Sequence, residues 1–316
     1  MHIRNLQVFC DVVRRRSFSK AAADNSMTQS GASQAVQQLE EYLQVQLLDR
    51  SKRPFLLTSE GTVFHVGCLQ LLRQFEALTE EVRSIGRENL TGRASIAAIY
   101  SIGLSYLPEL QRSIKCQHPK ADVRYQFGQP DEVYRLVEQG IVDFGLVSYP
   151  ESSKTILVTE WREETMVLAA VRGHALQSKA ELLPEDLATE TLVAFAPNLR
   201  IRHEIDRYLR HLGITMQVAA EFDNIDSVKH AMEVNSAVSF LPRPTVQAEL
   251  TDRTMIELRC PWLNLKRPLG LIQRRNDTLG RTARGVADFI LKGAWNQAPT
   301  TASSSKANPL AVNVAE

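Results

Sequence analysis

Between residues 93 and 149 the chain alternates short apolar segments with segments of helical spacing, and this order constrains the fold more than any other feature. The predicted strands are residues 93–101, 121–129 and 142–149, and the predicted helices between them are residues 104–119 and 130–140. Strand–helix–strand order predicts a parallel, doubly wound sheet with right-handed crossovers. A similar order recurs from about Thr165, so the sequence predicts an α/β fold with two similar lobes.

The first sixty residues differ from this pattern, because helices dominate there. Apolar residues at helical spacing predict a helix over 6–13, and a second, short helix follows, with Ser17 or Ser19 as its possible cap. Thr28 can cap a third helix. The apolar stripe of this third helix consists of Ala32, Val36, Leu39 and Leu43. Two short strands, at 47–48 and 55–57, then enclose a basic turn, and the whole predicts a winged helix-turn-helix.

The third helix lies within residues 26–43, a stretch that contains no Lys or Arg. Its polar face carries Gln and Ser side chains, which can donate and accept hydrogen bonds at base edges in the major groove. Positive charge for the phosphates is concentrated in the following turn, at Arg50, Lys52 and Arg53. The alternative is that this helix presents only the solvated polar face of a small helical domain.

The chain as a whole is not a polycation, because its 316 residues carry a formal net charge of only +1. Any nucleic-acid surface must therefore be local. The length predicts two or three compact units, and 44% hydrophobic content is ordinary for a globular protein. We find neither a signal-peptide pattern nor a run long enough to span a bilayer, and we expect a cytoplasmic protein without a membrane partner.

The cysteines at positions 10, 68, 116 and 260 are far apart and form no CxxC pair. This spacing indicates a reducing compartment, with neither a disulfide framework nor a zinc site, and we expect all four to be small core residues. A redox-sensing thiol is the alternative, and it would need an exposed thiolate of low pKa.

Residues 59 to about 86 predict one long helix with a near-heptad apolar stripe. The stripe can either pack within its own domain or pair with the same helix of a second copy. The final segment, 294–316, is rich in Ala, Ser, Thr and Pro without periodicity, and we expect it to be disordered.

The stretch 18–61 resembles the N-terminal domain of LysR-type transcriptional regulators. The matching residues are Phe18, Ala21, Ala22, Thr28, Gln29, Ser33, Leu39, Glu40, Val45, Leu47, Arg50, Thr58 and Gly61. The remainder is similar to that family too, with a long dimerisation helix and a two-lobed domain like that of periplasmic binding proteins. The domains expected are a winged helix-turn-helix (1–58), a linker helix (59–89) and an effector domain (92–293), with lobe I at 92–163 and 268–293 and lobe II at 164–267.

The resemblance implies a DNA-contacting set. Gln29, Ser30 and Ser33 would face bases, Thr28, Gln34 and Gln37 would lie near bases or backbone, and Arg50, Lys52 and Arg53 would be wing contacts. The chain departs from the family at Ser30, where Pro is common, and at Gln34, where Arg is common; the usual Leu at Asn25 and Gly at Gln44 are also absent. Without that Arg we expect the wing to contribute more of the phosphate binding. The partner would be operator DNA with dyad symmetry, bound by a homodimer or homotetramer.

Ligands of open α/β sheets bind beyond the carboxyl ends of the strands, next to helix N-termini. The candidate effector-binding positions of that kind are Tyr100, Ser101, Ile102, Gln129, Ser148, Phe195, Arg200, Arg202 and Asn224. Arg200 or Arg202 can hold a carboxylate, which would make the effector anionic; the alternative is ordinary surface arginines at a helix start. By the resemblance, Ser101 stands where the family often has a hydroxyl that contacts the effector.

An enzyme finds little support, because the sequence has no G-x-S-x-G, H-E-x-x-H or Walker loop and its seven histidines are scattered. We expect no catalytic residues, no cofactor and no metal. The favoured function is a sequence-specific DNA-binding transcriptional regulator, controlled by a small-molecule effector that binds between the two lobes. The alternative is a solute-binding protein of a transport system, whose architecture the C-terminal two thirds would share.

Overall fold

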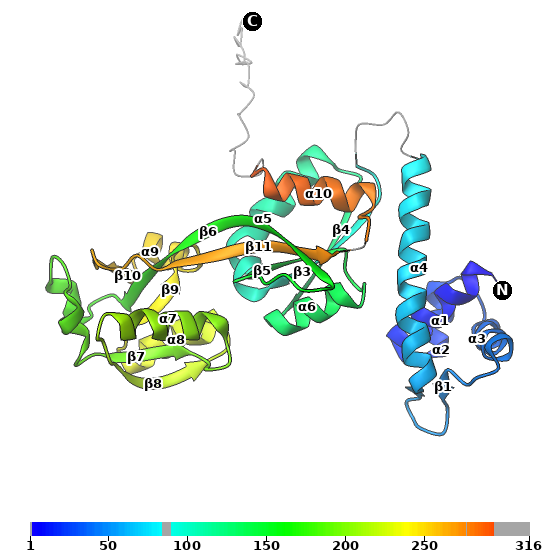
Figure 1. The fold of residues 1–316 in the computed structure, drawn as a ribbon, viewed down its shortest axis with the longest axis horizontal. Helices are drawn as coiled ribbons and strands as arrows, with labels where there is room; N and C mark the ends of the chain where they lie inside the picture. The colour runs from blue at the N-terminus through cyan, green and yellow to red at the C-terminus, as the bar shows by residue number, and fades with distance from the viewer. Residues whose placement is uncertain (1, 84–89, 276, 294–316) are drawn as a thin grey trace, which may run out of the picture.

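The computed structural model of the chain describes residues 2–83, 90–275 and 277–293. Within these residues the chain forms a helical N-terminal domain, one long helix and an elongated α/β region, in that order (Figure 1). The long helix stands between the N-terminal domain and the α/β region, and each of the three hydrophobic cores is a separate cluster.

Three helices build the N-terminal domain, namely α1 (Ile3–Arg15), α2 (Phe18–Asp24) and α3 (Gln29–Leu43). The stripe predicted for α3 packs inward, with Ala32, Val36 and Leu39 buried and Leu43 half-buried. It joins Phe9 of α1 in one core. Burial of one face leaves the opposite face of α3 to solvent.

The cap predicted at Thr28 is present, and of the two candidates for the second helix, Ser17 and Ser19, it is Ser17 that caps it. Ser17 Oγ accepts a hydrogen bond from Lys20 N at 3.4 Å and begins α2, and Thr28 Oγ1 accepts from Gly31 N at 3.1 Å and begins α3. Each bond satisfies one of the backbone N–H groups that a helix start leaves without an intrahelical partner.

A short hairpin follows α3 and forms the predicted wing. Its strands β1 (Leu48–Asp49) and β2 (Leu56–Leu57) pair antiparallel, with Leu48 opposite Leu57. The ring of Phe55 lies 5.3 Å from that of Phe18, which ties the base of the wing to α2.

The long helix α4 (Ser59–Arg83) begins on the N-terminal domain. A Cβ at Gly61 would lie 2.0 Å from the carbonyl oxygen of Leu47, so only glycine permits this approach. Cys68 of α4 meets Cys10 of α1, whose thiol donates a hydrogen bond to it; this bond and burial raise the pKa of Cys10. The predicted extension of this helix to residue 86, and the predicted linker end at 89, fall outside the described residues.

The expectation that all four cysteines are core residues is wrong for Cys116, which is exposed on α5 (Tyr100–Gln117). Cys10 and Cys68 are buried, and Cys260 is intermediate, with burial raising the pKa of its thiol to about 12. Helical spacing alone did not separate the inner from the outer face of that helix at Cys116.

The predicted strand–helix–strand order is present. Its elements are β3 (Arg93–Ile99), α5, β4 (Asp122–Gly128), α6 (Pro130–Glu138) and β5 (Phe144–Ser148). β3 pairs parallel with both β4 and β5, as a doubly wound sheet requires.

The expectation of a wholly parallel sheet is wrong, because two later strands run antiparallel. These are β6 (Ile156–Val171) and β11 (Lys266–Arg274), which pair with each other, and β11 also pairs antiparallel with β5. Only a short loop, 149–155, separates β5 from β6, too short for the crossover that a parallel strand needs. The resulting sheet has the order β10-β6-β11-β5-β3-β4, with β9 also paired to β6.

The remaining elements complete the α/β region, and all of them except α10 build its second half. They are β7 (Thr191–Phe195), α7 (Arg200–His211), β8 (Gln217–Phe222), α8 (Ile225–Asn235), β9 (Ser239–Pro242), α9 (Gln247–Asp252), β10 (Met255–Leu258) and α10 (Arg281–Leu291), with 3-10 turns at Ala175–Ser178, Pro184–Leu187 and Arg243–Val246. β7 and β8 pair parallel in a sheet of their own.

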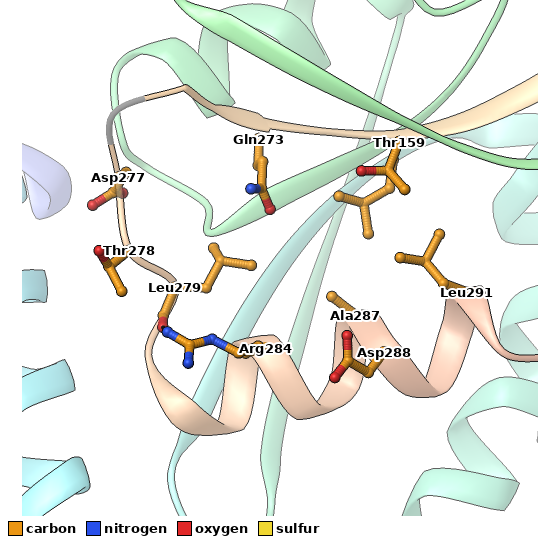
Figure 2. Close-up of a pocket in the computed structure, with 10 residues that line it drawn as sticks. Thr159, Gln273, Asp277, Thr278, Leu279, Arg284, Ala287, Asp288 and Leu291 are labelled. Atoms are coloured by element: carbon orange, nitrogen blue, oxygen red, sulfur yellow. The ribbon is translucent and has the colours of Figure 1, made fainter.

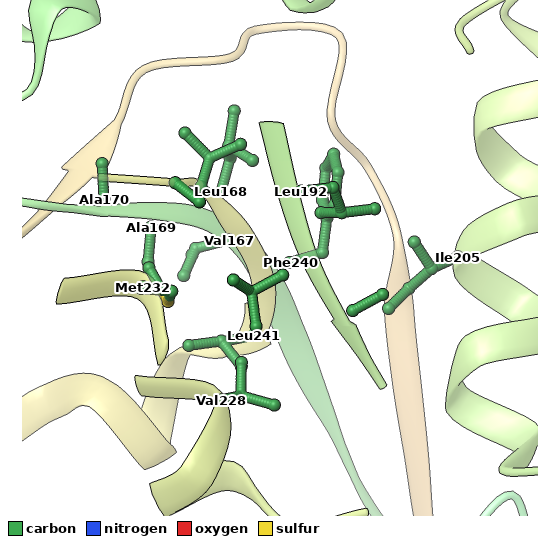
Figure 3. Close-up of a cluster of buried hydrophobic side chains, with 14 of the residues drawn as sticks. Val167, Leu168, Ala169, Ala170, Leu192, Ile205, Val228, Met232, Phe240 and Leu241 are labelled. Carbon is green, nitrogen blue, oxygen red and sulfur yellow. The ribbon is translucent and has the colours of Figure 1, made fainter. Parts of the chain in front are cut away.

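The α/β region contains two cores, which define its two lobes here. Lobe I is the part built around the buried residues from 90 to 156 and from 269 to 290, and lobe II is the part built around those from 166 to 258. Figure 3 shows the lobe II core, where Val167 and Leu168 of β6 lie with Phe240 and Leu241 of β9. β6 connects the two lobes, because its first residue, Ile156, lies in the lobe I core and Met166 to Ala170 lie in the lobe II core, while β11 pairs with β6 along its length.

No helix in the described part of the chain combines the length and the apolar character needed to cross a membrane. Across residues 2–83, 90–275 and 277–293 there is likewise no group of three or more His, Cys, Asp or Glu side chains placed to hold a metal ion.

Candidate DNA-binding surface and effector site

The polar face of α3 gathers the residues predicted to contact DNA. Thr28, Gln29, Ser30, Gln34 and Gln37 are exposed, and Ser33 is half-buried on the same helix. No acidic residue lies in the first turn of α3. Amide and hydroxyl groups therefore stand alone at the N-terminal end of the helix, where the helix dipole favours a phosphate.

Two hydrogen bonds on this face order its side chains. The hydroxyls of Thr28 and Ser30 lie 3.0 Å apart, and Gln37 Nε2 donates to Glu41 Oε1 at 2.9 Å. Gln37 is thus partly committed within α3, whereas Gln29 and Gln34 make no side-chain hydrogen bond to another described residue.

The position of the wing depends on Glu40, a buried residue that is 6% exposed. Its Oε1 accepts hydrogen bonds from Leu47 N at 2.9 Å and Leu48 N at 3.2 Å, and its Oε2 accepts from Arg50 at 3.0 Å. This role of Glu40 was not predicted from the sequence. The available signal was its place on the buried stripe, four residues after Val36, where a lone carboxylate must find donors.

The three wing cations are not equivalent. The Arg50 guanidinium is held by Glu40 and lies 5.6 Å over the ring of Phe18, so it supports the wing as well as facing outward. Lys52 and Arg53 are exposed and make no ion pair with the described residues. Neither cation is tied to a carboxylate in an ion pair, so both can approach a phosphate.

The basic run at the end of α1 is mostly neutralised. Arg14 pairs with Asp11 at 2.5 Å, and Arg15 pairs with Asp24 at 2.7 Å. The Arg15 guanidinium holds the pKa of the Asp24 carboxyl below its usual value. Only Arg16 of this run makes no ion pair with a described residue.

Three of the effector positions of lobe I lie at the start of α5. Tyr100 is 49% exposed there, whereas Ser101 and Ile102 are buried, and Ile102 belongs to the lobe I core. Ser101 Oγ accepts a hydrogen bond from Arg267 Nη2 at 2.6 Å. Ser148 ends β5 and is half-buried.

Arg267 belongs to a buried polar network that sequence reasoning missed. Its Nη1 pairs with Glu164 Oε2 at 3.0 Å, and Glu164 Oε1 accepts from the Tyr106 hydroxyl at 2.7 Å. Burial raises the pKa of Tyr106, and the Glu164 charge raises it further. Arg267 and Glu164 lie far apart in sequence on β11 and β6, so only the strand pairing brings them together.

The two lobes are joined by polar contacts near these positions. Gln129 Nε2 donates to Asp223 Oδ2 at 3.2 Å, and Arg200 of α7 pairs with Glu151, which follows β5. Tyr149 lies between the lobes, with a φ of +48° that is unusual for an aromatic residue. Its buried hydroxyl has no partner among the described residues, and burial raises its pKa to about 12.

The arginines predicted to hold an anion are already paired. Arg200 also bonds to Glu204 at 3.1 Å, and Arg202 bonds to Asp206, to Glu221 and to the carbonyl oxygen of Phe195. Asn224 is likewise engaged, because its Oδ1 caps α8 by accepting from Ser227 N at 2.9 Å.

Comparison with known proteins assigns both halves of the chain. Residues 3–62 match the family described as "Bacterial regulatory helix-turn-helix protein, lysR family", and residues 87–295 match the family described as "LysR substrate binding domain". Together the two matches cover most of the chain. The chain belongs to the LysR family.

Relatives in the LysR family match along nearly their whole length. The HTH-type transcriptional regulator YeiE of Escherichia coli K12 is 27% identical over 291 residues, which cover 92% of this chain and 97% of YeiE. The HTH-type transcriptional regulator CysL of Bacillus subtilis is 26% identical over 272 residues, or 86% and 91% of the two chains.

Solved structures agree with the fold of this LysR-family chain. A full-length OxyR variant from Pseudomonas aeruginosa aligns with a TM-score of 0.73 at 18% identity, covering 98% of this chain and 99% of that one. Full-length CbnR in complex with its target DNA aligns with a TM-score of 0.66 at 20% identity, covering 93% and 100%.

The protein is therefore a DNA-binding transcriptional regulator with an effector-binding domain, and the transport alternative is not supported. LysR regulators bind DNA and small-molecule effectors, and they are not enzymes as a class.

Two surface cavities lie away from most of the predicted effector positions. One, of about 340 Å³, lies in lobe I between β11 and α10, where Gln273 faces Ala287 and Leu291 (Figure 2). The other, of about 440 Å³, lies beside α7 in lobe II and includes Arg202 in its wall. Arg202 is the one predicted effector residue that lines either of them.

Proposed function

We propose that the N-terminal half of α3 reads base edges in the major groove through Gln29, Ser30 and Ser33, while Lys52 and Arg53 of the wing bind phosphates. The observation that carries this proposal is the division of α3 into a buried apolar face and an exposed face without basic residues. Gln can bond an adenine edge through both amide groups, and Ser can serve as donor or acceptor. Thr28, Gln34 and Gln37 would lie at the edge of the same surface.

The test is selection of bound DNA from a random pool, followed by a footprint of the selected site. We expect an enriched site with dyad symmetry, protected on two successive faces of the duplex. Enrichment without any common sequence would contradict base reading by α3, and absence of binding at low salt would overturn the proposal as a whole.

We also propose a homodimer in which α4 pairs with its copy. The support is a stripe of exposed apolar residues on this helix, namely Val63, Leu71, Phe75, Leu78 and Val82. Such a stripe is costly to leave in water and is typical of a helix–helix interface. Sedimentation equilibrium of the wild type and of Phe75→Glu tests it; a dimer unaffected by that charge would contradict it. Association of dimers into a tetramer would show as a second step in the same experiment.

For the effector we propose a site between the lobes, at the carboxyl ends of β3 and β5. The support is the free hydroxyl of Tyr149 beside buried Ser101 and Arg267, together with the exposed ring of Tyr100. The predicted anionic character of the effector would require a ligand that competes with Glu151 and Glu204 for Arg200.

A thermal-shift panel of small carboxylates with matched neutral amides tests this site. We expect a stabilising compound whose effect is lost in Tyr149→Phe, and selective stabilisation by the carboxylates would support the anionic prediction. Stabilisation that persists in Tyr149→Phe would place the ligand elsewhere.

The division of the chain at 58, 89 and 293 remains our proposal for its domains, supported by an N-terminal core that is separate from the two cores of the α/β region. The first half of α4 contributes Cys68 to the N-terminal core, so that this domain would extend past residue 58 in packing terms. We further propose a cytoplasmic location, since a transcriptional regulator acts where the DNA is. We also propose that the protein has no catalytic activity, since LysR regulators are not enzymes as a class.

A further inference from the structure

The second half of α4 lies against lobe I of the same chain. The contacting residues are Gln70, Arg73, Ala77 and Glu80, which recur every three or four positions and therefore share one face of the helix. The exposed apolar residues Leu71, Phe75, Leu78 and Val82 lie on a different face. One helix thus presents a polar face to its own lobe I and keeps an apolar face free.

The first contact is an ion pair. Arg73 Nη1 lies 3.7 Å from Asp143 Oδ1, and their side chains are only 19% and 22% exposed. The other oxygen of Asp143 accepts hydrogen bonds from Ser95 N at 2.6 Å and Ser95 Oγ at 2.7 Å. Asp143 is therefore held by β3 and lies directly before β5, so the carboxylate that Arg73 meets is fixed in place.

The second contact is at the N-terminus of α10. The N-cap of that helix, Gly280, has no side chain to satisfy the first N–H groups. Glu80 supplies the missing acceptor, because its Oε1 accepts from Thr282 N at 3.0 Å and also from the Thr282 hydroxyl. A carboxylate at this end of a helix also interacts favourably with the helix dipole.

Lobe I has glycines where α4 approaches. A Cβ at Gly92 would lie 2.4 Å from Glu80 Cδ, and a Cβ at Gly280 would lie 3.3 Å from Ala77 Cβ. Thr282, which receives Glu80, is fully buried and accepts a hydrogen bond from Gly92 N at 3.1 Å. The shape of lobe I and its charge therefore both suit this helix face.

We propose that Arg73 and Glu80 form a latch that holds α4, and with it the DNA-binding domain, in one orientation relative to lobe I. The first half of α4 is packed into the N-terminal core, so release of the second half would let the whole N-terminal domain swing as one body. The apolar face stays free in the latched state, so pairing of two α4 helices does not require the latch to open.

The latch also sits at the far ends of two strands that carry predicted effector contacts. β3 begins beside Gly92 and ends before Tyr100, and β5 begins after Asp143 and ends at Ser148. At about 3.3 Å per residue, the seven residues of β3 span about 20 Å. A shift at the effector end of these strands reaches the latch directly. This coupling rests on the proposed effector site, whereas the latch itself does not.

The latch is tested on the full-length protein without DNA or ligand. The variant is Arg73→Ala with Glu80→Ala, and the conservative version is Arg73→Lys with Glu80→Gln, which keeps a cation and a carbonyl acceptor. Arg83→Ala, on the exposed end of the same helix, is the matched control. Asp143 is left unchanged, because its carboxylate also holds Ser95.

Two measurements are made, one of the contact between Glu80 and α10 and one of the orientation of the N-terminal domain that this contact would hold. Amide exchange over residues 281–284 reports on the Glu80 cap, and we expect about fivefold faster exchange in the alanine variant. Size-exclusion-coupled X-ray scattering reports on the domain arrangement, and we expect a larger maximum dimension at unchanged mass. The conservative and control variants should match the wild type in both.

Unchanged amide exchange in the alanine variant would mean that the contact is not populated in solution and would overturn the latch. Faster exchange with unchanged scattering would reduce Glu80 to a local helix cap and would also overturn it. Failure of DNA binding or of effector binding leaves both measurements valid, so the latch and the proposed function can fail independently.

Discussion

The wing and lobe II use their cations in opposite ways. Lys52 and Arg53 are exposed at the tip of the wing without an ion pair to the described residues, whereas Arg200 and Arg202 of α7 are each bonded to two carboxylates. An unpaired surface cation can release counterions when it meets a phosphate, but a paired one must first give up its partner. The unpaired cations of the wing are the ones we propose to bind phosphates, whereas Arg200 and Arg202 form ion pairs that join α7 to neighbouring segments.

We expect the largest effect from Glu40→Ala. This variant removes the buried carboxylate that pairs with Arg50 and positions the wing. The change leaves Leu47 N and Leu48 N without an acceptor and frees Arg50, so we expect a loss of about 3 kcal/mol in the free energy of unfolding. Urea unfolding measures it. Glu41→Ala, at the neighbouring exposed carboxylate, is the control, and equal losses in both would contradict the role of Glu40.

Gln29→Ala tests the contribution of α3, because it removes an uncharged side chain and leaves every cation of the wing in place. We expect discrimination between the selected operator and random DNA to fall by about 2 kcal/mol, roughly thirtyfold, with little change on random DNA. Competition binding measures both affinities. Gln38→Ala is the matched control, since the Gln38 amide bonds to Asn5 at 3.0 Å. Equal losses on both DNAs would refute base reading by Gln29.

Arg53→Ala tests the free cation itself. We expect an affinity loss of about fivefold at moderate salt and a salt slope that is smaller by about one, for any DNA sequence. Arg200→Ala removes the same charge from the paired set and should leave the slope unchanged. Equal changes in the salt slope for Arg53→Ala and Arg200→Ala would contradict the distinction between free and paired cations.

Gln34→Arg is expected to have the smallest effect. It restores the cation that the LysR family often carries on α3, and we expect about threefold tighter binding to random DNA with a salt slope larger by about one. Binding to the selected operator and to random DNA across a salt series measures it. An unchanged slope would mean that the residue at position 34 does not reach a phosphate.

Local pattern was sufficient for the N-terminal domain. The caps Ser17 and Thr28, the buried stripe of α3 and the hairpin at 48–57 are all decided by neighbours within a few turns of chain, and the structure confirms each. The partners of individual side chains could not be predicted from the sequence in the same way. The commitment of Arg50 to Glu40 depends on how the wing folds back onto α3, and no local spacing encodes that.

The α/β region shows where local pattern fails. The repeated strand–helix order correctly indicated α/β lobes, but the first half of β6 and all of β11 were not recognised as strands, and the sheet is mixed rather than parallel. Both strands pair with partners far away in sequence, and β11 returns to lobe I only after lobe II is complete. The Arg267–Glu164 pair and the Tyr149 position follow from that pairing.

The family, a helix-turn-helix whose third helix carries no Lys or Arg, and the α/β class of the rest could all be predicted from the sequence, because caps and periodicities act over short distances. Tertiary structure alone decided which cations are free and which are paired. It also placed Arg73 and Glu80 on lobe I, with Glu80 bonded to a residue 202 positions away. The sequence gives the charge of each side chain, but its ion-pair partner depends on which distant segments pack against it.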